Sequence, residues 1–173
     1  MSKPIAIGSV AELLAHAKAM ESEALERYLD LAEQMEVHHN PEVAELFRKM
    51  ARVERKHVEK ILERVGDKDL PHIPPWEYQW LGEEAAEAIS NEDVHYLMTP
   101  HHALTLALGA ERRAFGFYTR VVETVEPGEL LELARELMEE EREHVALIEA
   151  WLAKVPEPAD DWAEDPDPPL LQE

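Results

Sequence analysis

Two stretches with the same pattern decide the fold: Glu54-Arg55-Lys56-His57-Val58-Glu59-Lys60-Ile61 and Glu141-Arg142-Glu143-His144-Val145-Ala146-Leu147-Ile148. Both read Glu-Arg-x-His-Val-x-x-Ile. On a helix, residues three apart share a face, so each copy directs one carboxylate and one imidazole to the same side. The pattern therefore predicts two helices that each present a pair of metal-ligating side chains.

The repeated flanking residues separate this pair of motifs from chance matches. Glutamate fills 30 of the 173 positions and there are nine histidines, so about one or two Glu-x-x-His matches are expected by chance. Four occur. The other two, Glu36/His39 and Glu92/His95, do not share their flanks: the first directly precedes a helix-ending Asn40-Pro41, and the second lies in a stretch without a sustained apolar period.

Each of the two motifs is preceded by a helical pattern in which a tyrosine follows a glutamate by seven residues. The pairs are Glu21 with Tyr28 and Glu111 with Tyr118, and the chain contains only four tyrosines. Residues seven apart lie on one face, and the rest of that register is apolar, so both glutamates occupy core positions. The apolar residues of the two registers are Leu14, Ala17, Ala24, Leu31 and Met35, and Leu104, Ala107, Ala114, Val121 and Val125.

Four carboxylates in one core require a neutralising partner, because burial of an unpaired carboxylate costs several kcal/mol. Two divalent ions carry the four positive charges that balance them and leave the two histidines neutral. Oxygen ligands with two imidazoles suit iron or manganese, and no soft sulfur ligand is present to select copper.

The composition narrows the class of protein. The length suits one domain, and the absence of cysteine excludes disulfides, thiolate zinc sites and iron–sulfur clusters. A net charge of −21 argues against binding to nucleic acid or to an anionic membrane, since both attract basic surfaces. No signal-peptide pattern and no membrane-spanning apolar run occurs, so we expect a cytoplasmic protein.

The apolar periods and caps predict an all-α fold of four helices in two antiparallel pairs. Ser9, Asn40-Pro41 and Thr99-Pro100 begin the first three helices, and Glu126-Pro127 begins the fourth. The helices end near residues 36, 66, 125 and 155. Inward positions on the last two include Leu104, Leu108, Phe115, Val122, Leu130, Leu133, Leu137, Ile148 and Trp151.

Two further segments lie outside the helices. Residues 66–98 read as a long crossover that contains a short helical stretch at about 82–90 and the aromatic residues Trp76, Tyr78 and Trp80. These aromatics fit the outside of a bundle or the seam of a homodimer. Residues 156–173 form an acidic, proline-rich tail, which is either solvated or docked through Trp162 and Leu170-Leu171.

This arrangement resembles the ferritin-like di-iron carboxylate proteins, and rubrerythrins in particular, over about residues 9–155. The resemblance implies one domain for residues 1–155 and two iron ions per chain, with manganese possible. The implied ligands are Glu54 and Glu141 as bridges, Glu21 and Glu111 as terminal carboxylates, and His57 and His144 on one ion each. It also implies that Tyr28 and Tyr118 donate hydrogen bonds to ligand carboxylates.

Two differences from rubrerythrins are visible. Ala114 stands where they carry a further glutamate, which puts their redox-linked iron movement in doubt, and their four-cysteine electron-transfer domain is missing. Electrons would therefore come from a separate donor. The other histidines, among them His16, His101 and His102, are not assigned to the site.

The function implied by the resemblance is that of a di-iron oxidoreductase that oxidises a bound Fe(II) pair with hydrogen peroxide or O2, as a peroxidase or a ferroxidase. A non-catalytic iron-binding or storage protein is the alternative. An O2-activating hydroxylase is a further alternative, but the acidic surface disfavours it for a membrane-bound substrate.

Overall fold

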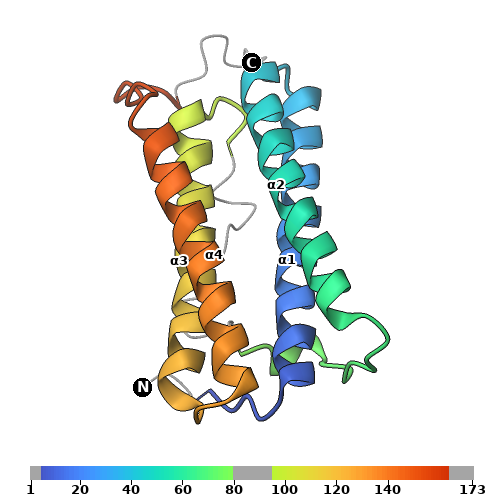
Figure 1. Cartoon of the computed structure of the whole chain (residues 1–173). Coiled ribbons are helices and arrows are strands. Elements are labelled where there is room, and N and C mark those ends of the chain that lie inside the picture. Colours follow the sequence, from blue (N-terminus) through green and yellow to red (C-terminus); the bar gives the residue numbers. More distant parts are fainter. Residues whose placement is uncertain (1–4, 80–94, 164–173) are drawn as a thin grey trace.

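The protein is a bundle of four long helices (Figure 1). The computed structural model describes residues 5–79 and 95–163. Its helices are α1 (Val10–Val37), α2 (Pro41–Val65), α3 (Pro100–Thr124) and α4 (Glu129–Leu152), with a short 3-10 helix η1 (Pro75–Glu77). These described ranges contain no strand. The predicted all-α four-helix bundle is confirmed.

The helices form two antiparallel pairs. α1 packs along α2 and α3 along α4, and the contacts within each pair are far more extensive than those between the pairs (Figure 1). The side-chain amide of Asn40, in the turn between α1 and α2, donates hydrogen bonds to the carbonyls of Met98 (2.8 Å) and Tyr96 (3.3 Å). The crossover thus brings α3 to the end of the bundle where α2 begins. The helical stretch expected at 82–90, and Trp80, lie outside the described residues.

The predicted caps form at the first two helices. The hydroxyl of Ser9 accepts a hydrogen bond from the backbone N–H of Glu12 (3.1 Å), and the Asn40 side chain accepts one from that of Val43 (3.4 Å). The start expected for the fourth helix at Glu126-Pro127 is wrong by a few residues, because Gly128 has φ 154° and ψ −169° and α4 begins only after it. That backbone conformation is open to glycine almost alone and is incompatible with a helix.

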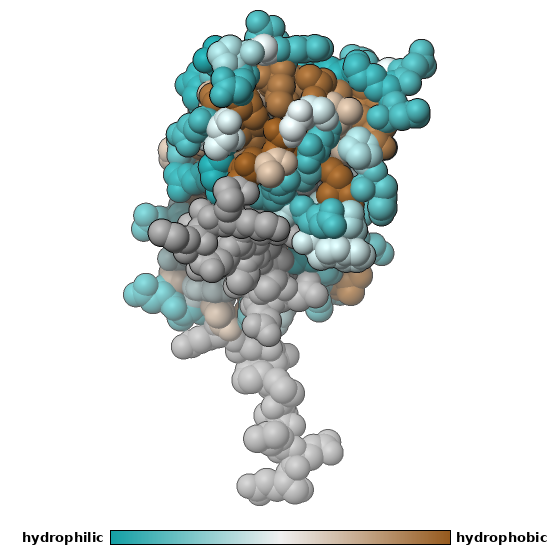
Figure 2. Space-filling model, turned by 90° about the horizontal axis from the view of Figure 1, so that it is seen from below, coloured by the Kyte–Doolittle hydropathy of each residue, from teal (hydrophilic) through white to brown (hydrophobic). Residues whose placement is uncertain are grey.

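Two hydrophobic clusters fill the bundle, one toward each end of the view in Figure 1. The upper cluster includes Tyr28, Leu31, Met35, Phe47, Met50, Leu104 and Ile148, and the lower cluster includes Leu13, Leu14, Ile61, Phe117, Tyr118, Val121 and Leu137. Along every helix the predicted ligands fall between the two clusters. Figure 2, which views the lower end, shows hydrophobic residues reaching the surface between hydrophilic ones.

The inward set expected on α3 and α4 needs one correction. Phe115 and Val122 are only partly buried, whereas Phe117 is completely buried and stacks on the ring of His16 with centroids 6.0 Å apart. On α4, Leu131 and Ala134 are more deeply buried than Leu130 and Leu133. A helix inside a bundle buries a face wider than one heptad register, and the prediction followed only the register of the ligands.

The first part of the acidic tail returns to the bundle. The ring of Trp162 lies 3.9 Å from that of His102, between centroids, and packs against the upper cluster. Trp162 is therefore docked on the bundle and not solvated. Leu170-Leu171 lie outside the described residues. Within residues 5–79 and 95–163, no helix has the length and apolar character needed to cross a membrane.

Candidate metal centre

The six predicted ligands converge in the middle of the bundle. They form two groups, each with two carboxylates and one imidazole close enough to hold one ion: Glu21, Glu54 and His57, and Glu111, Glu141 and His144. We call these the first and the second triad. Each triad comes from one antiparallel helix pair, and five of the six residues are buried, with His144 partly exposed. Their role as ligands remains a prediction.

The geometry of the first triad centres on one ring nitrogen. Nδ1 of His57 lies 3.5 Å from an oxygen of Glu21 and 3.5 Å from an oxygen of Glu54. The i,i+3 spacing on α2 places Glu54 beside His57, and α1 supplies Glu21 from across the helix pair.

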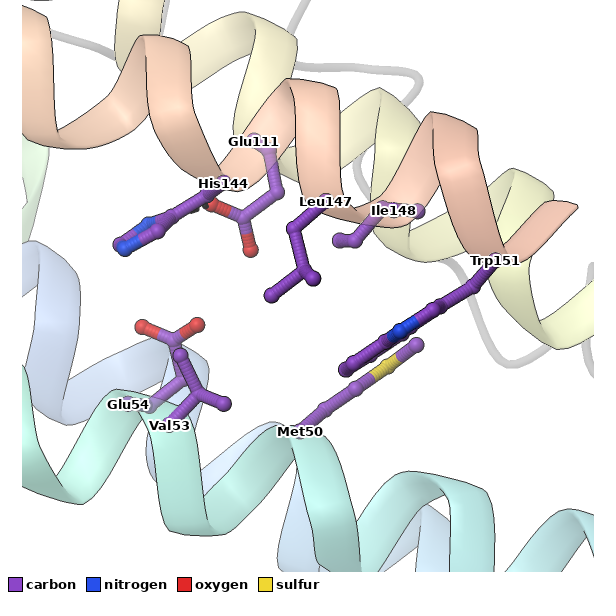
Figure 3. Close-up of a pocket in the computed structure, with 8 residues that line it drawn as sticks. All are labelled: Met50, Val53, Glu54, Glu111, His144, Leu147, Ile148 and Trp151. Carbon is purple, nitrogen blue, oxygen red and sulfur yellow. Dashed lines mark ion pairs between the residues drawn. The ribbon is translucent and has the colours of Figure 1, made fainter.

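The second triad repeats this geometry. Nδ1 of His144 lies 3.4 Å from Glu111 and 3.5 Å from Glu141. The rings of His57 and His144 stack across the bundle, with centroids 3.9 Å apart and an interplanar angle of 8°. The sequence duplication thus becomes a site with two near-equivalent halves. Figure 3 shows the side chains of Glu54, Glu111 and His144 directed toward the same space between α2 and α4.

Burial and mutual repulsion raise the pKa values of all four carboxyl groups. Burial raises the pKa of Glu54 to about 7 even though His57 lowers it, and the charge of Glu21 adds to the increase. The pKa of Glu141 is raised well above the usual range, first by burial and then by the charge of Glu111. Without a cation, this site therefore favours protons on its carboxylates.

The histidines respond in the opposite sense to burial. Burial alone would lower the pKa of His57, but the carboxylates of Glu21 and Glu54 raise it to about 9. Burial would likewise lower the pKa of His144, but Glu111, together with Glu54 and Glu21, raises it. The site is thus a cluster of anionic groups that attracts positive charge, whether carried by protons or by metal ions.

The donor set fits a pair of divalent transition-metal ions. Among the described residues, Nδ1 of His57 and Nδ1 of His144 are buried without a hydrogen-bond partner, although each faces two carboxylate oxygens. Ligands held about 2.0–2.2 Å from one shared ion lie roughly 3.0–3.5 Å apart, and the observed spacings of 3.4–3.5 Å are close to this. A buried ring nitrogen that lacks a hydrogen bond suits a metal ligand.

Tyr28 and Tyr118 lie beside the site, but the expected hydrogen bonds to ligand carboxylates do not form in this structure. Both side chains are buried, and neither hydroxyl has a hydrogen-bond partner among the residues that are described. Burial raises both pKa values well above 10, with the charge of Glu111 next in effect at Tyr28 and that of Glu21 at Tyr118. The largest effect of a charge on the pKa of each tyrosine thus comes from the terminal glutamate of the opposite half of the site.

The remaining histidines stay outside the two triads. His16 is buried in the lower cluster, and its Nδ1 lies 2.9 Å from the carbonyl of Glu12. His102 is half-buried rather than solvated, because Trp162 covers it and its Nδ1 accepts a hydrogen bond from the N–H of Thr99 (3.1 Å). Their hydrogen bonds are local, but their burial could not be predicted from the sequence, since it depends on the distant rings of Phe117 and Trp162.

Comparison with known proteins places this site in a family. The rubrerythrin family model matches residues 12–98, which is half of the chain. The chain belongs to the rubrerythrin family. The resemblance inferred from the ligand pattern is thereby confirmed, and the two triads fit a di-iron protein.

A solved structure supports this membership along most of the rubrerythrin fold. An uncharacterized conserved protein from Magnetospirillum magnetotacticum MS-1 is 38% identical and superposes with a TM-score of 0.70. The match covers 88% of this chain and 99% of that one, so it includes the second helix pair as well as the first. Among curated proteins, none matches.

Proposed function

We propose that this rubrerythrin-family protein is a di-iron oxidoreductase. The observation that carries the proposal is the pairing of the two triads: each presents an unpartnered ring nitrogen to two buried carboxylates, and the two rings lie 3.9 Å apart. A site that holds two redox-active ions side by side can deliver two electrons to one oxidant. A structural metal site requires neither the duplication nor this proximity.

Each half of the site contributes two carboxylates and one imidazole to the proposed ligand set. Glu54 and Glu141 would be the carboxylates shared by the two ions, Glu21 and Glu111 would each ligate one ion, and His57 and His144 would each add one imidazole ligand. Burial is the main cause of the raised pKa values of Glu21 and Glu111, and His57 and His144 act against it. The charge of Glu141 raises the pKa of Glu21 further, and the charge of Glu54 raises that of Glu111 further. This coupling between the halves supports Glu54 and Glu141 as the shared carboxylates.

An Fe(II) pair supplies two electrons, which reduce one hydrogen peroxide to two waters with two protons, or one O2 to hydrogen peroxide with two protons. Beside the site, the two tyrosine hydroxyls keep their protons, because burial raises their pKa values well above 10. Return to the reduced state requires a separate electron donor, because the chain has no cysteine for an iron–sulfur centre.

The test is anaerobic loading with Fe(II), followed by mixing with hydrogen peroxide or with O2 while the near-ultraviolet absorption of the oxidised pair is recorded. Saturation at two irons per chain with rapid oxidation supports the oxidoreductase. Continued uptake beyond two irons per chain would instead indicate iron storage. A protein that binds two irons but reacts with neither oxidant would contradict the proposal. Glu54→Ala serves as the control that lacks a bridging ligand.

A further inference from the structure

A pocket opens between α2 and α4 and leads directly to the candidate metal centre. Its outer walls are the apolar side chains of Met50, Val53, Leu147, Ile148 and Trp151. Its inner end is formed by one ligand from each of α2, α3 and α4, namely Glu54, Glu111 and His144. Figure 3 shows Leu147 pointing into the space between these ligands and Trp151, with Met50 alongside the Trp151 ring.

Polar contacts close the interface of α2 and α4 on both sides of this pocket. Toward one end of the helices, Nζ of Lys49 lies 3.9 Å from the centroid of the Trp151 ring. Toward the other end, Arg64 pairs with Glu136 (2.6 Å) and Glu140 (3.4 Å). Between these contacts lie the stacked rings of His57 and His144 and an ion pair of Lys60 with Glu140 (3.8 Å). The apolar contact of the two helices is therefore local, and the five residues of the outer wall set its chemistry.

The lining discriminates between oxidants by polarity. Apart from the indole N–H of Trp151, the outer wall offers no hydrogen-bonding side chain. A polar molecule such as hydrogen peroxide would have to give up hydrogen bonds to water on its way in, whereas an apolar molecule has none to lose. The carboxylates at the inner end also repel anions.

We propose that this pocket is the access route and waiting site of dioxygen, and that Leu147 controls its width. This inference rests on the oxidoreductase function proposed above and assigns it a preferred oxidant. Leu147 is 39% exposed and belongs to α4 one turn after the ligand His144, so it stands at the mouth of the pocket. A larger side chain at this position fills the pocket without replacing a metal ligand.

The first measurement needs no metal. In the full-length metal-free protein, dissolved O2 is paramagnetic and broadens the methyl resonances of residues that it contacts. We expect stronger broadening at Met50 and Ile148 than at Met20 and Ile61, which are of the same residue types, are also buried and do not line the pocket. Equal broadening at both pairs would overturn the proposal, whatever the activity of the iron-loaded protein.

The second measurement compares Leu147→Trp with Leu29→Trp, which changes a leucine of similar exposure, 41%, on the outside of α1. We expect Leu147→Trp to lose the O2 broadening at Met50 and to slow the oxidation of bound Fe(II) by O2 about tenfold, with two irons still bound per chain. Leu29→Trp should behave like the unaltered protein. An unchanged O2 rate in Leu147→Trp, or an equal slowing with hydrogen peroxide, would overturn the proposal and leave the oxidoreductase function standing.

Discussion

His57 and His144 stack their imidazole rings 3.9 Å apart, although they are 87 positions apart in the chain and belong to different helix pairs. Two protonated rings at this distance would repel each other by about 4 kcal/mol at an effective dielectric constant near 20. In line with this, the charge of His144 opposes the rise in the pKa of His57 that the carboxylates cause. Metal ligation removes the conflict because it requires both rings to be neutral.

Metal binding should therefore stabilise the fold. Fe(II) or Mn(II) at about 100 times its dissociation constant should add about 3 kcal/mol to the free energy of unfolding, measured as a rise in melting temperature under anaerobic conditions. Glu54→Ala and Glu141→Ala should lose this response. Glu59→Ala, which removes an exposed glutamate from α2, should keep it. If both ligand variants retain the full stabilisation, the ligand assignment is wrong.

Replacing a buried ligand carboxylate by a hydrophobic residue should stabilise the metal-free protein and abolish metal binding. We expect Glu54→Leu to raise the free energy of unfolding of chelator-treated protein by about 1–3 kcal/mol, since it removes a carboxyl group that burial and the charge of Glu21 disfavour more than His57 compensates. The same variant should no longer respond to Mn(II). Denaturant unfolding of both proteins with and without Mn(II) makes the comparison, and a metal-free Glu54→Leu protein less stable than the unaltered chain would contradict it.

The metal-free protein should lose stability as the pH rises. The pKa of His57 is raised from 6.5 to about 9, so its stabilising contribution is complete below pH 6.5 and is lost as the pH rises to 9. Glu54, raised from 4.5 to about 7, acts in the same direction because the folded state holds its proton more tightly than the unfolded state does. Melting temperatures of chelator-treated protein between pH 6 and 9 test this.

The matching expectation concerns metal affinity, which should rise over the same pH range because metal ions compete with protons for the ligands. His57→Phe should flatten the pH dependence of metal-free stability above pH 6.5. Stability that increases from pH 6.5 to 9 in the unaltered metal-free protein would show that the carboxylates do not hold the proton on His57.

The convergence of the six candidate ligands could be predicted from the sequence because it depends on local periodicity. Glu54 and His57 share a face on any helix. The seven-residue spacing of Glu21 and Tyr28 likewise places both on one face of their helix, the face that is buried in the bundle. Burying these groups in one bundle then brings the carboxylates together. The stacking of His57 on His144 could not be predicted, since it depends on the distance between two helix pairs that no local pattern encodes.

Other differences have the same origin. Phe117 lies off the register of Glu111 and Tyr118, yet it is completely buried because His16 of α1 packs against it. The pocket at Leu147 requires knowledge of how α2 and α4 face each other. The later start of α4, at Glu129, has a different and local cause, namely the non-helical backbone conformation of Gly128.

The docked tail should contribute to stability. Trp162 lies against the ring of His102 and packs on the upper cluster, so Trp162→Ala should lower the free energy of unfolding by about 1–2 kcal/mol, or several degrees in melting temperature for a chain of this size. Trp162→Phe should retain most of the stability, and Asp161→Ala, at an exposed neighbour, should change little. A Trp162→Ala protein that melts with the unaltered protein would show that the tail is only loosely attached.

The crossover should mediate self-association. Trp76, in η1, is 83% exposed, and tryptophan is enriched at protein interfaces relative to the rest of the surface. We expect a homodimer at micromolar concentration in sedimentation velocity, and Trp76→Glu should shift it toward the monomer because each subunit would then place a charge in the shared seam. Leu29→Glu, on the outside of α1, should leave the dimer intact. A monomeric unaltered protein at that concentration would rule out this role for Trp76.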